Sequence, residues 1–423
     1  MYWTSDIREL IVSAGVTAGL LDYYQHAAAL ADALLTWQAR PASAETRPAA
    51  VPVMAGREQA LAWARAERAN LIGCLEHVTG TGQHARIIAL TAGLAALLRH
   101  DGPWVEALTR HATALRAARH LADRPGQADA LTNLGDVRRM TGDYPGAARD
   151  LQDALGLFRD LGDRHGQATA LRILGDARHL TGDYPGAARD LEEALGISRD
   201  LGDRHGQARA LTILGMARQF TGDYPGAARD LEEALGLFRD LGDRHGQAGT
   251  LSFLGDLRRL TGDYLAAARD LEEALGISRD LGNRHGQANA LTILGSVRRA
   301  TGDHPGAARD LEEALDIYRD IGDRGAEAEA LNEAGTLHKV CGDLRQAGSC
   351  HQHALDLARQ IGSAWDEAHA LAGLGRCALA AGHTAEAEDN LRKALEIFQR
   401  IGAPEATDVA GELGALIKAR PTG

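Results

Sequence analysis

The feature that most constrains this chain is a repeat with a fixed period of forty residues. The sixteen residues from Thr181 to Gly196 occur again, unchanged, from Thr221 to Gly236. Because units of fixed length stack on their neighbours, the sequence predicts one elongated array rather than several separate globular domains. Eight units follow from glycines that keep the step of forty, at Gly102, Gly142, Gly182, Gly222, Gly262, Gly302, Gly342 and Gly382.

Each unit contains two apolar patterns with the spacing of an amphipathic helix. Gly222-Asp223 separates the two patterns of one unit, since glycine ends a helix in the left-handed conformation and aspartate caps the next helix. Pro225 is tolerated in a first helical turn. The sequence therefore predicts an all-α fold in which helices alternate with tight turns. The apolar positions of this unit are Ala210, Leu211 and Leu214, then Ala227, Leu231, Ala234, Leu235 and Leu241.

A glycine also stands in the middle of nearly every first helix, where it is less favourable than alanine by about 1 kcal/mol. We expect a close approach of the second helix to offset this, with small residues such as Ala227 and Ala234 at the contact and leucines around it. These glycines are Gly135, Gly175, Gly215, Gly255, Gly295, Gly335 and Gly375.

These motifs, Leu-Gly in the first helix, Gly-Asp-Tyr in the turn and spaced Ala and Leu in the second helix, resemble the tetratricopeptide repeat. The variety is the long one with extended helices, similar to the repeats of cell-polarity adaptor scaffolds. The resemblance covers Ile88 to about Thr407 and implies a right-handed superhelical solenoid. The chain departs from the family pattern in two ways. A position of the first helix that is usually aromatic holds arginine, as at Arg178, and the first unit has Thr91 and Ala95 where the other units have leucine and glycine.

The ends of the chain do not follow the period. Residues 1–80 contain helical patterns at 20–27 and 60–71, joined by a Pro/Ala-rich loop at about 40–56. They resemble the segment before the sensor repeats of actinobacterial NB-ARC/STAND regulators, but the sequence contains no G-x-x-x-x-G-K-[ST] phosphate loop. We therefore expect a sensor arm without its NTPase core, either stand-alone or part of a larger regulator. The repeats occupy residues 81–407, and residues 408–423 are predicted to form a capping helix and tail.

The first helices vary between units, whereas the second helices remain nearly constant. In tetratricopeptide arrays the first helices line a concave groove, and residues three or four apart on one helix share a face. Free drift of solvated positions and selection for binding both explain this variation, and the sequence leaves both open. It predicts a groove for a protein or peptide carrying both charges, lined by Asp129, Thr132, Asp136, Arg139, Arg172, Asp176, Arg209, Met216, Gln219, Asp256, Arg259, Arg299 and Asn332.

An arginine series offers an alternative function. These residues could contact the phosphates of nucleic acid, or their stems could lie on the helices while the guanidinium groups pair with carboxylates of the Asp143 or Glu193 series. A net charge of −12 and an aromatic content of 4% disfavour binding to nucleic acid or anionic membranes. The series is Arg138, Arg178, Arg218, Arg258 and Arg298, joined by Arg139, Arg259 and Arg299.

No motif for catalysis or a cofactor occurs: H-E-x-x-H, G-x-S-x-G and glycine-rich nucleotide loops are absent from the sequence. The histidines at His165, His205, His245 and His285 are a whole repeat apart, and neighbours in Cys350-His351-Gln352-His353 point in different directions, so no metal site is expected. The chain has four cysteines, no apolar run of about 18 residues and no signal-peptide pattern, from which we expect a cytoplasmic protein.

The sequence thus predicts a non-catalytic interaction module, the sensor or adaptor arm of a signalling or transcription-control system, with an NTPase or DNA-binding regulator among its partners. The alternative is a nucleic-acid-associated regulator that uses the arginine series.

Overall fold

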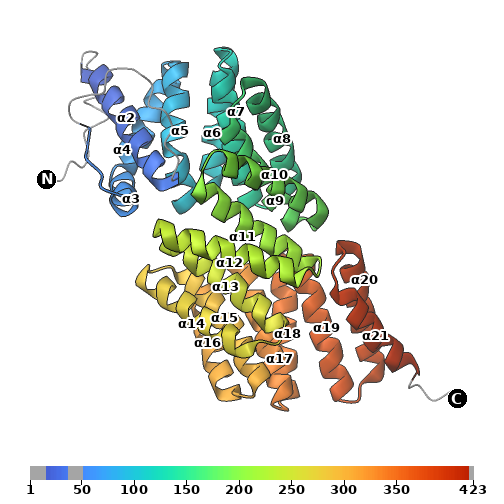
Figure 1. Ribbon diagram of the computed structural model, residues 1–423. Coiled ribbons are helices and arrows are strands. Elements are labelled where there is room, and N and C mark those ends of the chain that lie inside the picture. The colour runs from blue at the N-terminus through green and yellow to red at the C-terminus, as the bar shows by residue number, and fades with distance from the viewer. Residues whose placement is uncertain (1–15, 37–50, 419–423) are drawn as a thin grey trace. The chain divides into compact units, whose positions relative to one another are not determined.

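The computed structural model describes residues 16–36 and 51–418, and in these ranges it consists of α-helices without a strand (Figure 1). The all-α prediction is confirmed. The predicted Pro/Ala-rich loop lies outside the described residues as far as residue 50, and so does the tail from 419 to 423.

The chain divides into two units, one formed by residues 1–181 and 189–206 and the other by residues 182–188 and 207–423. The first unit contains α2 (Val16–Thr36), α3 (Arg57–Ala66), α4 (Arg68–Gly80), α5 (His84–Asp101), α6 (Trp104–His120), α7 (Arg124–Met140), α8 (Tyr144–Leu161) and α9 (Arg164–Leu180). Helices α10 (Tyr184–Asp200) and α11 (Arg204–Phe220) have residues in both units.

The second unit continues with α12 (Tyr224–Leu241), α13 (Arg244–Leu260), α14 (Tyr264–Asp280), α15 (Arg284–Thr301), α16 (His304–Ile321), α17 (Arg324–Val340), α18 (Leu344–Ile361), α19 (Ala364–Ala380), α20 (Thr384–Ile401) and α21 (Glu405–Lys418). Helix α21 falls where the capping helix is predicted. Each forty-residue repeat is therefore one odd-numbered helix followed by one even-numbered helix, from α5 and α6 to α19 and α20.

The turns form as their residues predict. Gly222 has a φ of 82°, in the left-handed region that favours glycine. The Asp223 carboxylate then accepts a hydrogen bond of 3.0 Å from the Gly226 N–H and so caps α12. The same capping bond recurs in most repeats: the Gly146 N–H donates to Asp143 Oδ1, and the Gly306 N–H donates to Asp303 Oδ1.

The helical glycines mark the contact between the two helices of a repeat. A Cβ atom added to Gly255 would lie 2.6 Å from the Leu271 Cγ and 3.3 Å from the Ala267 carbonyl oxygen. Gly135, Gly215, Gly295 and Gly375 meet the equivalent leucine in the same way. The predicted close approach is confirmed, but the contact atoms are a leucine side chain and a backbone carbonyl rather than alanine methyl groups.

The odd-numbered helices form the inner layer of each unit. Consecutive odd-numbered helices touch each other, namely α5 and α7, α7 and α9, α13 and α15, α15 and α17, and α17 and α19. The described even helices do not contact each other to the same extent. This holds for α6 and α8, and for consecutive even helices from α12 to α20. Because one layer is packed closely and the other is splayed, each unit curves with its odd helices inside. In each unit, we call the surface formed by its odd helices, from α5 to α19 in chain order, the inner face of that unit.

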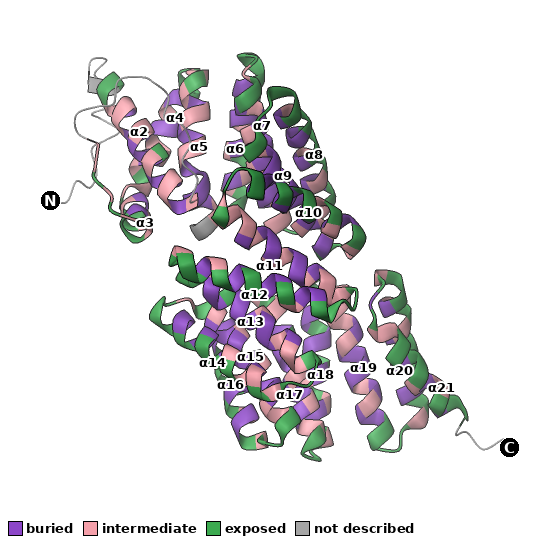
Figure 2. Cartoon of the chain, in the orientation of Figure 1, coloured by how far each residue is buried: buried purple, intermediate pink, exposed green. Residues whose placement is uncertain are grey.

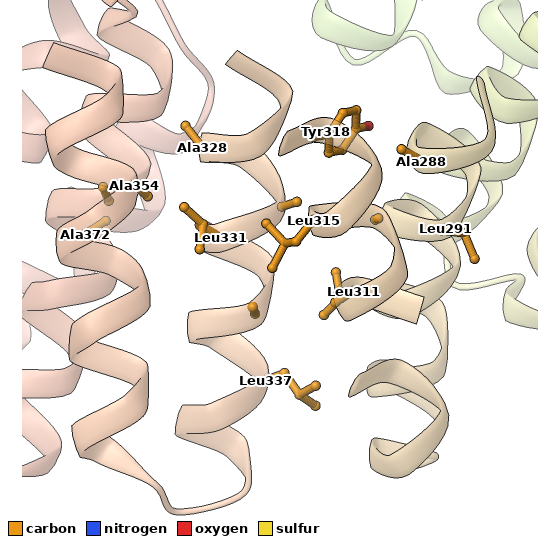
Figure 3. Close-up of a cluster of buried hydrophobic side chains, with 14 of the residues drawn as sticks. Ala288, Leu291, Leu311, Leu315, Tyr318, Ala328, Leu331, Leu337, Ala354 and Ala372 are labelled. Carbon is orange, nitrogen blue, oxygen red and sulfur yellow. The ribbon is translucent and has the colours of Figure 1, made fainter. Parts of the chain in front are cut away.

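Buried residues follow the contacts between successive helices (Figure 2). Figure 3 shows part of this core in the second unit, where Leu311, Leu315 and Tyr318 of α16 lie between Leu291 of α15 and Leu331 of α17. Every layer of the core therefore contains side chains from adjacent helices, as expected for a stacked array.

The N-terminal helices share a core with the first repeat. Leu21 and Tyr24 of α2 and Leu71 of α4 are buried together with Leu94 of α5. The single helix predicted around residues 60–71 is divided into α3 and α4, which meet at Glu67, and Glu67 accepts a hydrogen bond of 2.8 Å from the Tyr24 hydroxyl. Helices α2–α4 thus cover the end of the array.

His351 occupies a position that holds leucine in most repeats, and it is 2% exposed. Its ring packs against Gly335 and Gly373, and its Nδ1 lies 3.1 Å from the Asn332 Oδ1. Burial, with repulsion from Arg376, lowers the pKa of His351 to about 4, although Glu333 acts in the opposite direction. The imidazole is therefore neutral in the folded protein at neutral pH.

We predict that Gly255→Ala destabilises the protein by ~1–3 kcal/mol, because the new methyl group overlaps Leu271 and the backbone of α14. Gly276→Ala in α14 is the control, since nothing lies within 4 Å of its added Cβ, and we expect it to stabilise by about 0.5–1 kcal/mol. Urea unfolding of both variants tests this. Equal effects of the two substitutions would contradict the packing described.

We also predict an acid-sensitive contribution from His351. Its pKa in the folded state lies below the ordinary value of about 6.5, so the unfolded chain binds the extra proton first. Its contribution to stability is complete above pH ~6.5 and is lost as the pH falls toward about 4, by at most about 1.4 kcal/mol per pH unit.

The measurement is the unfolding free energy of His351→Leu between pH 7.5 and pH 4.5. The variant should lose less stability over this range than the wild type. Removal of the exposed His353, as His353→Gln, should leave the wild-type pH dependence, and parallel profiles for all three proteins would overturn the prediction.

Candidate functional site on the inner face

In the first unit, charged side chains from three successive odd helices form a connected cluster. Arg99 Nη1 of α5 lies 3.3 Å from Asp136 Oδ2 of α7, and Arg139 Nη2 lies 2.9 Å from Asp136 Oδ1. Arg139 Nη1 also reaches Asp176 Oδ2 of α9 at 3.0 Å. We call Arg99, Asp136, Arg139, Arg172 and Asp176 the arginine cluster. It contains three guanidinium groups and two carboxylates.

Asp136 is the centre of this cluster and is only 6% exposed. Burial alone would raise the pKa of its carboxyl group, but Arg139, Arg99 and Arg172 outweigh that effect and hold the pKa well below its ordinary value. His111 of α6, which is also buried, has its pKa lowered to about 4 by burial and by Arg99. It is therefore neutral and adds no charge to the cluster at neutral pH.

The second unit has its own group of charged inner-face side chains, and in this group carboxylates outnumber arginines. Arg259 Nη2 lies 2.7 Å from Asp256 Oδ1 in α13, and Arg299 Nη2 of α15 lies 3.2 Å from Glu333 Oε2 of α17. Glu329 and Asp366 add two further negative charges. We call Asp256, Arg259, Arg299, Glu329, Glu333 and Asp366 the acidic cluster, with two arginines and four carboxylates.

Glu329 is the member of the acidic cluster with the most perturbed carboxyl group. Its side chain is exposed, but surrounding protein raises its pKa, and repulsion from Asp366, Glu333 and Asp256 adds to the shift. Arg259 acts in the opposite direction. Solvent screens part of this repulsion, so the direction of the shift is what matters: this part of the inner face favours a positive charge.

The thirteen predicted groove residues all lie on odd helices, but their environments differ. Thr132 is buried and donates a hydrogen bond to the Ala128 carbonyl in its own helix, and Asn332 is buried against His351. Gln219 donates to Asp256 Oδ2 at 3.0 Å. Asp129, Arg209 and Met216 are partly exposed. The arginine cluster brings together Asp136, Arg139, Arg172 and Asp176, and the acidic cluster Asp256, Arg259 and Arg299.

Sequence reasoning missed Arg99, Glu333 and Asp366. Arg99 precedes Arg139 by one period, so the repeat spacing could have identified it despite the divergence of its unit. Glu333 stands where other repeats hold Ile173, Ile213, Phe253 and Ile293, so its departure from the internal pattern was the available signal. Asp366 precedes α19's periodic residues, and nothing in the repeat marks it.

The arginine series proposed as an alternative nucleic-acid contact is paired within each repeat. Arg138 Nη1 lies 2.6 Å from Asp150 Oδ2, and Arg218 and Arg298 lie equally close to Asp230 and Asp310. The main partners are thus the Asp150 series, whereas Asp143 lies at 3.6 Å and the Glu193 series pairs instead with arginines such as Arg159 of the preceding repeat. Their carboxylate partners already occupy these guanidinium groups.

No three or more His, Cys, Asp or Glu side chains in the described ranges are grouped so that they could hold a metal ion. In the repeated H-G-Q-A motif, the glutamine that follows the histidine by two residues makes a structural hydrogen bond: Gln247 Nε2 donates to the Phe238 carbonyl at 3.1 Å. Within residues 16–36 and 51–418, no helix has the length and apolar character needed to span a membrane.

We predict that Asp136→Asn destabilises the protein by ~3–5 kcal/mol, because it leaves Arg99, Arg139 and Arg172 without their central negative charge. The matched control is Asp160→Asn, which removes an exposed ion pair with Arg124 and should have little effect. Chemical unfolding measures both. Comparable stability of the two variants would show that the cluster is not coupled through Asp136.

Several solved structures have a fold similar to that of this chain. A Rap conjugation gene regulator of the plasmid pLS20, solved with the Phr* peptide, has a TM-score of 0.59 and 13% identity over 79% of this chain and 95% of that chain. A Rap protein complexed with Competence and Sporulation Factor has a TM-score of 0.56 and 13% identity, over 78% of this chain and 97% of that one.

A STAND protein with a tetratricopeptide repeat sensor from Pyrococcus horikoshii has a TM-score of 0.53 and 13% identity, over 96% of this chain and 70% of that one. At these identities the similarity concerns the fold alone. No curated protein sequence matches the chain.

The tetratricopeptide repeat family matches four consecutive segments, residues 86–160, 166–240, 246–320 and 326–400, which together make up well over half of the sequence. Each segment spans the four helices of two successive repeats, in the register of the odd and even helices. The chain therefore belongs to the tetratricopeptide repeat family, whose fold is generally a non-catalytic scaffold for protein interaction.

Proposed function

We propose that the inner face binds a peptide or an extended protein segment, and that the chain acts as the sensor or adaptor arm of a signalling or transcription-control system. The observation that carries this proposal is a difference between two groups of charged residues, those that recur between repeats and those that do not. Arginines that recur at one position in several repeats, such as Arg138 and Arg218, pair with carboxylates of the same repeat, whereas charges that differ between repeats gather in the arginine and acidic clusters.

The even helices offer a partner little beyond a uniform surface. Arg159 of α8 lies 2.8 Å from Glu193 of α10, and Arg279 of α14 lies 2.9 Å from Glu313 of α16, each in the next repeat. These exposed pairs contribute little individually and recur along the array. A partner that reads a particular sequence requires positions that differ, and the inner face supplies them.

The comparisons are compatible with this proposal. One Rap protein of similar fold was solved with the Phr* peptide and another with Competence and Sporulation Factor, and the Pyrococcus horikoshii STAND protein has a tetratricopeptide repeat sensor. A role in the cytoplasm, beside an NTPase or DNA-binding regulator, remains part of the proposal. The pairing of the arginine series leaves the nucleic-acid alternative without a specific observation in its favour.

Two glycines provide a matched test of the binding face. Gly249 in α13 is exposed at an inner-face position, Gly276 in α14 is exposed on the even-helix layer, and an added Cβ meets nothing within 4 Å at either site. Gly249→Arg and Gly276→Arg therefore introduce the same charge and bulk on opposite layers of one repeat.

The experiment selects binders to the full chain from a random library of linear dodecapeptides at physiological salt and measures their affinity by fluorescence polarisation. We expect Gly249→Arg to weaken the selected peptides at least about tenfold through obstruction, and Gly276→Arg to leave them unchanged. Loss of binding in Gly276→Arg alone would place the site on the outer layer, and the absence of any selected peptide would count against peptide binding.

A further inference from the structure

Arg172 is the one member of the arginine cluster without a direct partner. It is 8% exposed, yet among the described residues its guanidinium group forms neither a hydrogen bond nor an ion pair. Asp136 and Asp176 attract it at longer range, while Arg139 and Arg99 repel it. A guanidinium presents five N–H donors, and none of the Arg172 nitrogens is fully enclosed without a partner, so these donors are accessible to a ligand.

The repeats themselves show that the fold does not need an arginine here. The equivalent positions hold threonine, serine, asparagine or alanine, at Thr132, Thr212, Ser252, Thr292, Asn332 and Ala372. The hydroxyl groups of Thr132, Thr212 and Thr292 donate to the carbonyl four residues earlier in the same helix, at 2.8, 2.9 and 2.9 Å. Arg172 thus replaces a small, internally satisfied side chain with a long cation.

The surroundings cannot neutralise that cation. Asp136 already accepts from Arg99 and Arg139, and Asp176 is paired with Arg139, so three guanidinium groups share two carboxylates. His111 is neutral because burial lowers its pKa to about 4. Burial likewise lowers the pKa of Arg172, to about 10, so the side chain keeps its charge at neutral pH. The cluster therefore lacks one negative charge.

We propose that Arg172, with Arg139 beside it, forms a carboxylate-binding subsite that receives one carboxylate of the bound peptide. This inference rests on the proposed function and names the chemistry of its ligand. A planar guanidinium matches a carboxylate with two parallel N–H···O bonds, which an ammonium or a hydroxyl group cannot provide. The side chains of Arg139 and Asp176 remain about one-fifth exposed, at 21% each, so the cluster is open to a ligand.

The carboxylate could come from an aspartate or glutamate side chain or from a peptide C-terminus. Two synthetic pools of N-acetylated random dodecapeptides, one with amidated and one with free C-termini, are incubated with the immobilised full chain, and retained peptides are sequenced by mass spectrometry. Enrichment of Asp and Glu in the amidated pool assigns a side chain. Retention from the free-acid pool without such enrichment assigns the terminus.

Arg172→Thr is the test variant, because it restores the residue found in neighbouring repeats and is expected to fold. We expect it to bind the selected peptides at least about tenfold more weakly and to lose the preference for a carboxylate. Removal of the buried cation should also raise its thermal midpoint. Arg149→Thr, which removes an exposed arginine from α8, is the charge-matched control and should retain both affinity and preference.

A second measurement uses only the wild-type protein and changes the ligand. In the best selected peptide, replacement of the enriched Glu by Gln, or amidation of the free terminus, should reduce affinity at least about tenfold. Equal affinity of Arg172→Thr and wild type for that peptide, or no loss on neutralising its carboxylate, would overturn the subsite. In both cases peptide binding itself would stand. Failure of the wild type to retain any peptide would overturn the proposed function and, with it, this inference.

Discussion

The structure depends on one contact that recurs in most repeats, in which a leucine of the even helix lies against a helical glycine of the odd helix. In the unit of Gly255 and Leu271, a single added methyl group would overlap both the leucine and the backbone of the even helix. The two helices can approach this closely only because the glycine lacks a side chain. That spacing fixes how each hairpin presents its remaining faces, and stacking then buries them against the next repeat.

The same contact explains why the repeat is so uniform on one layer and so varied on the other. The even helices carry the leucines, begin at the capping turns and supply the carboxylates that pair with the arginine series, such as Asp150 with Arg138 of the preceding odd helix. The odd helices carry the glycine on one side and face the interior of the curve with the other. Residues such as Arg172 and Glu329 are therefore able to differ between repeats without disturbing the stacking.

Much of the fold could be predicted from the sequence because its signals are local and repeated. The turn glycines, the aspartate caps and the period of forty each specify one element. The interactions between repeats were harder to predict. Arg139 reaches Asp176 of the next helix, and Arg138 pairs with Asp150 rather than Asp143, because side-chain length and helix spacing select among several nearby carboxylates. Glu333 and Asp366 entered the site only through the curvature that brings neighbouring odd helices together.

The central claim is that a peptide or protein segment is bound by the odd helices. Hydrogen–deuterium exchange of the full chain, with and without a saturating selected peptide, tests this most directly, because it reports protection along every helix without any substitution. We expect the peptide to slow exchange in segments from odd helices, including α7, α9 or α13, while the even helices α8 and α14 change little. Protection confined to the even helices, or to α2–α4, would contradict it.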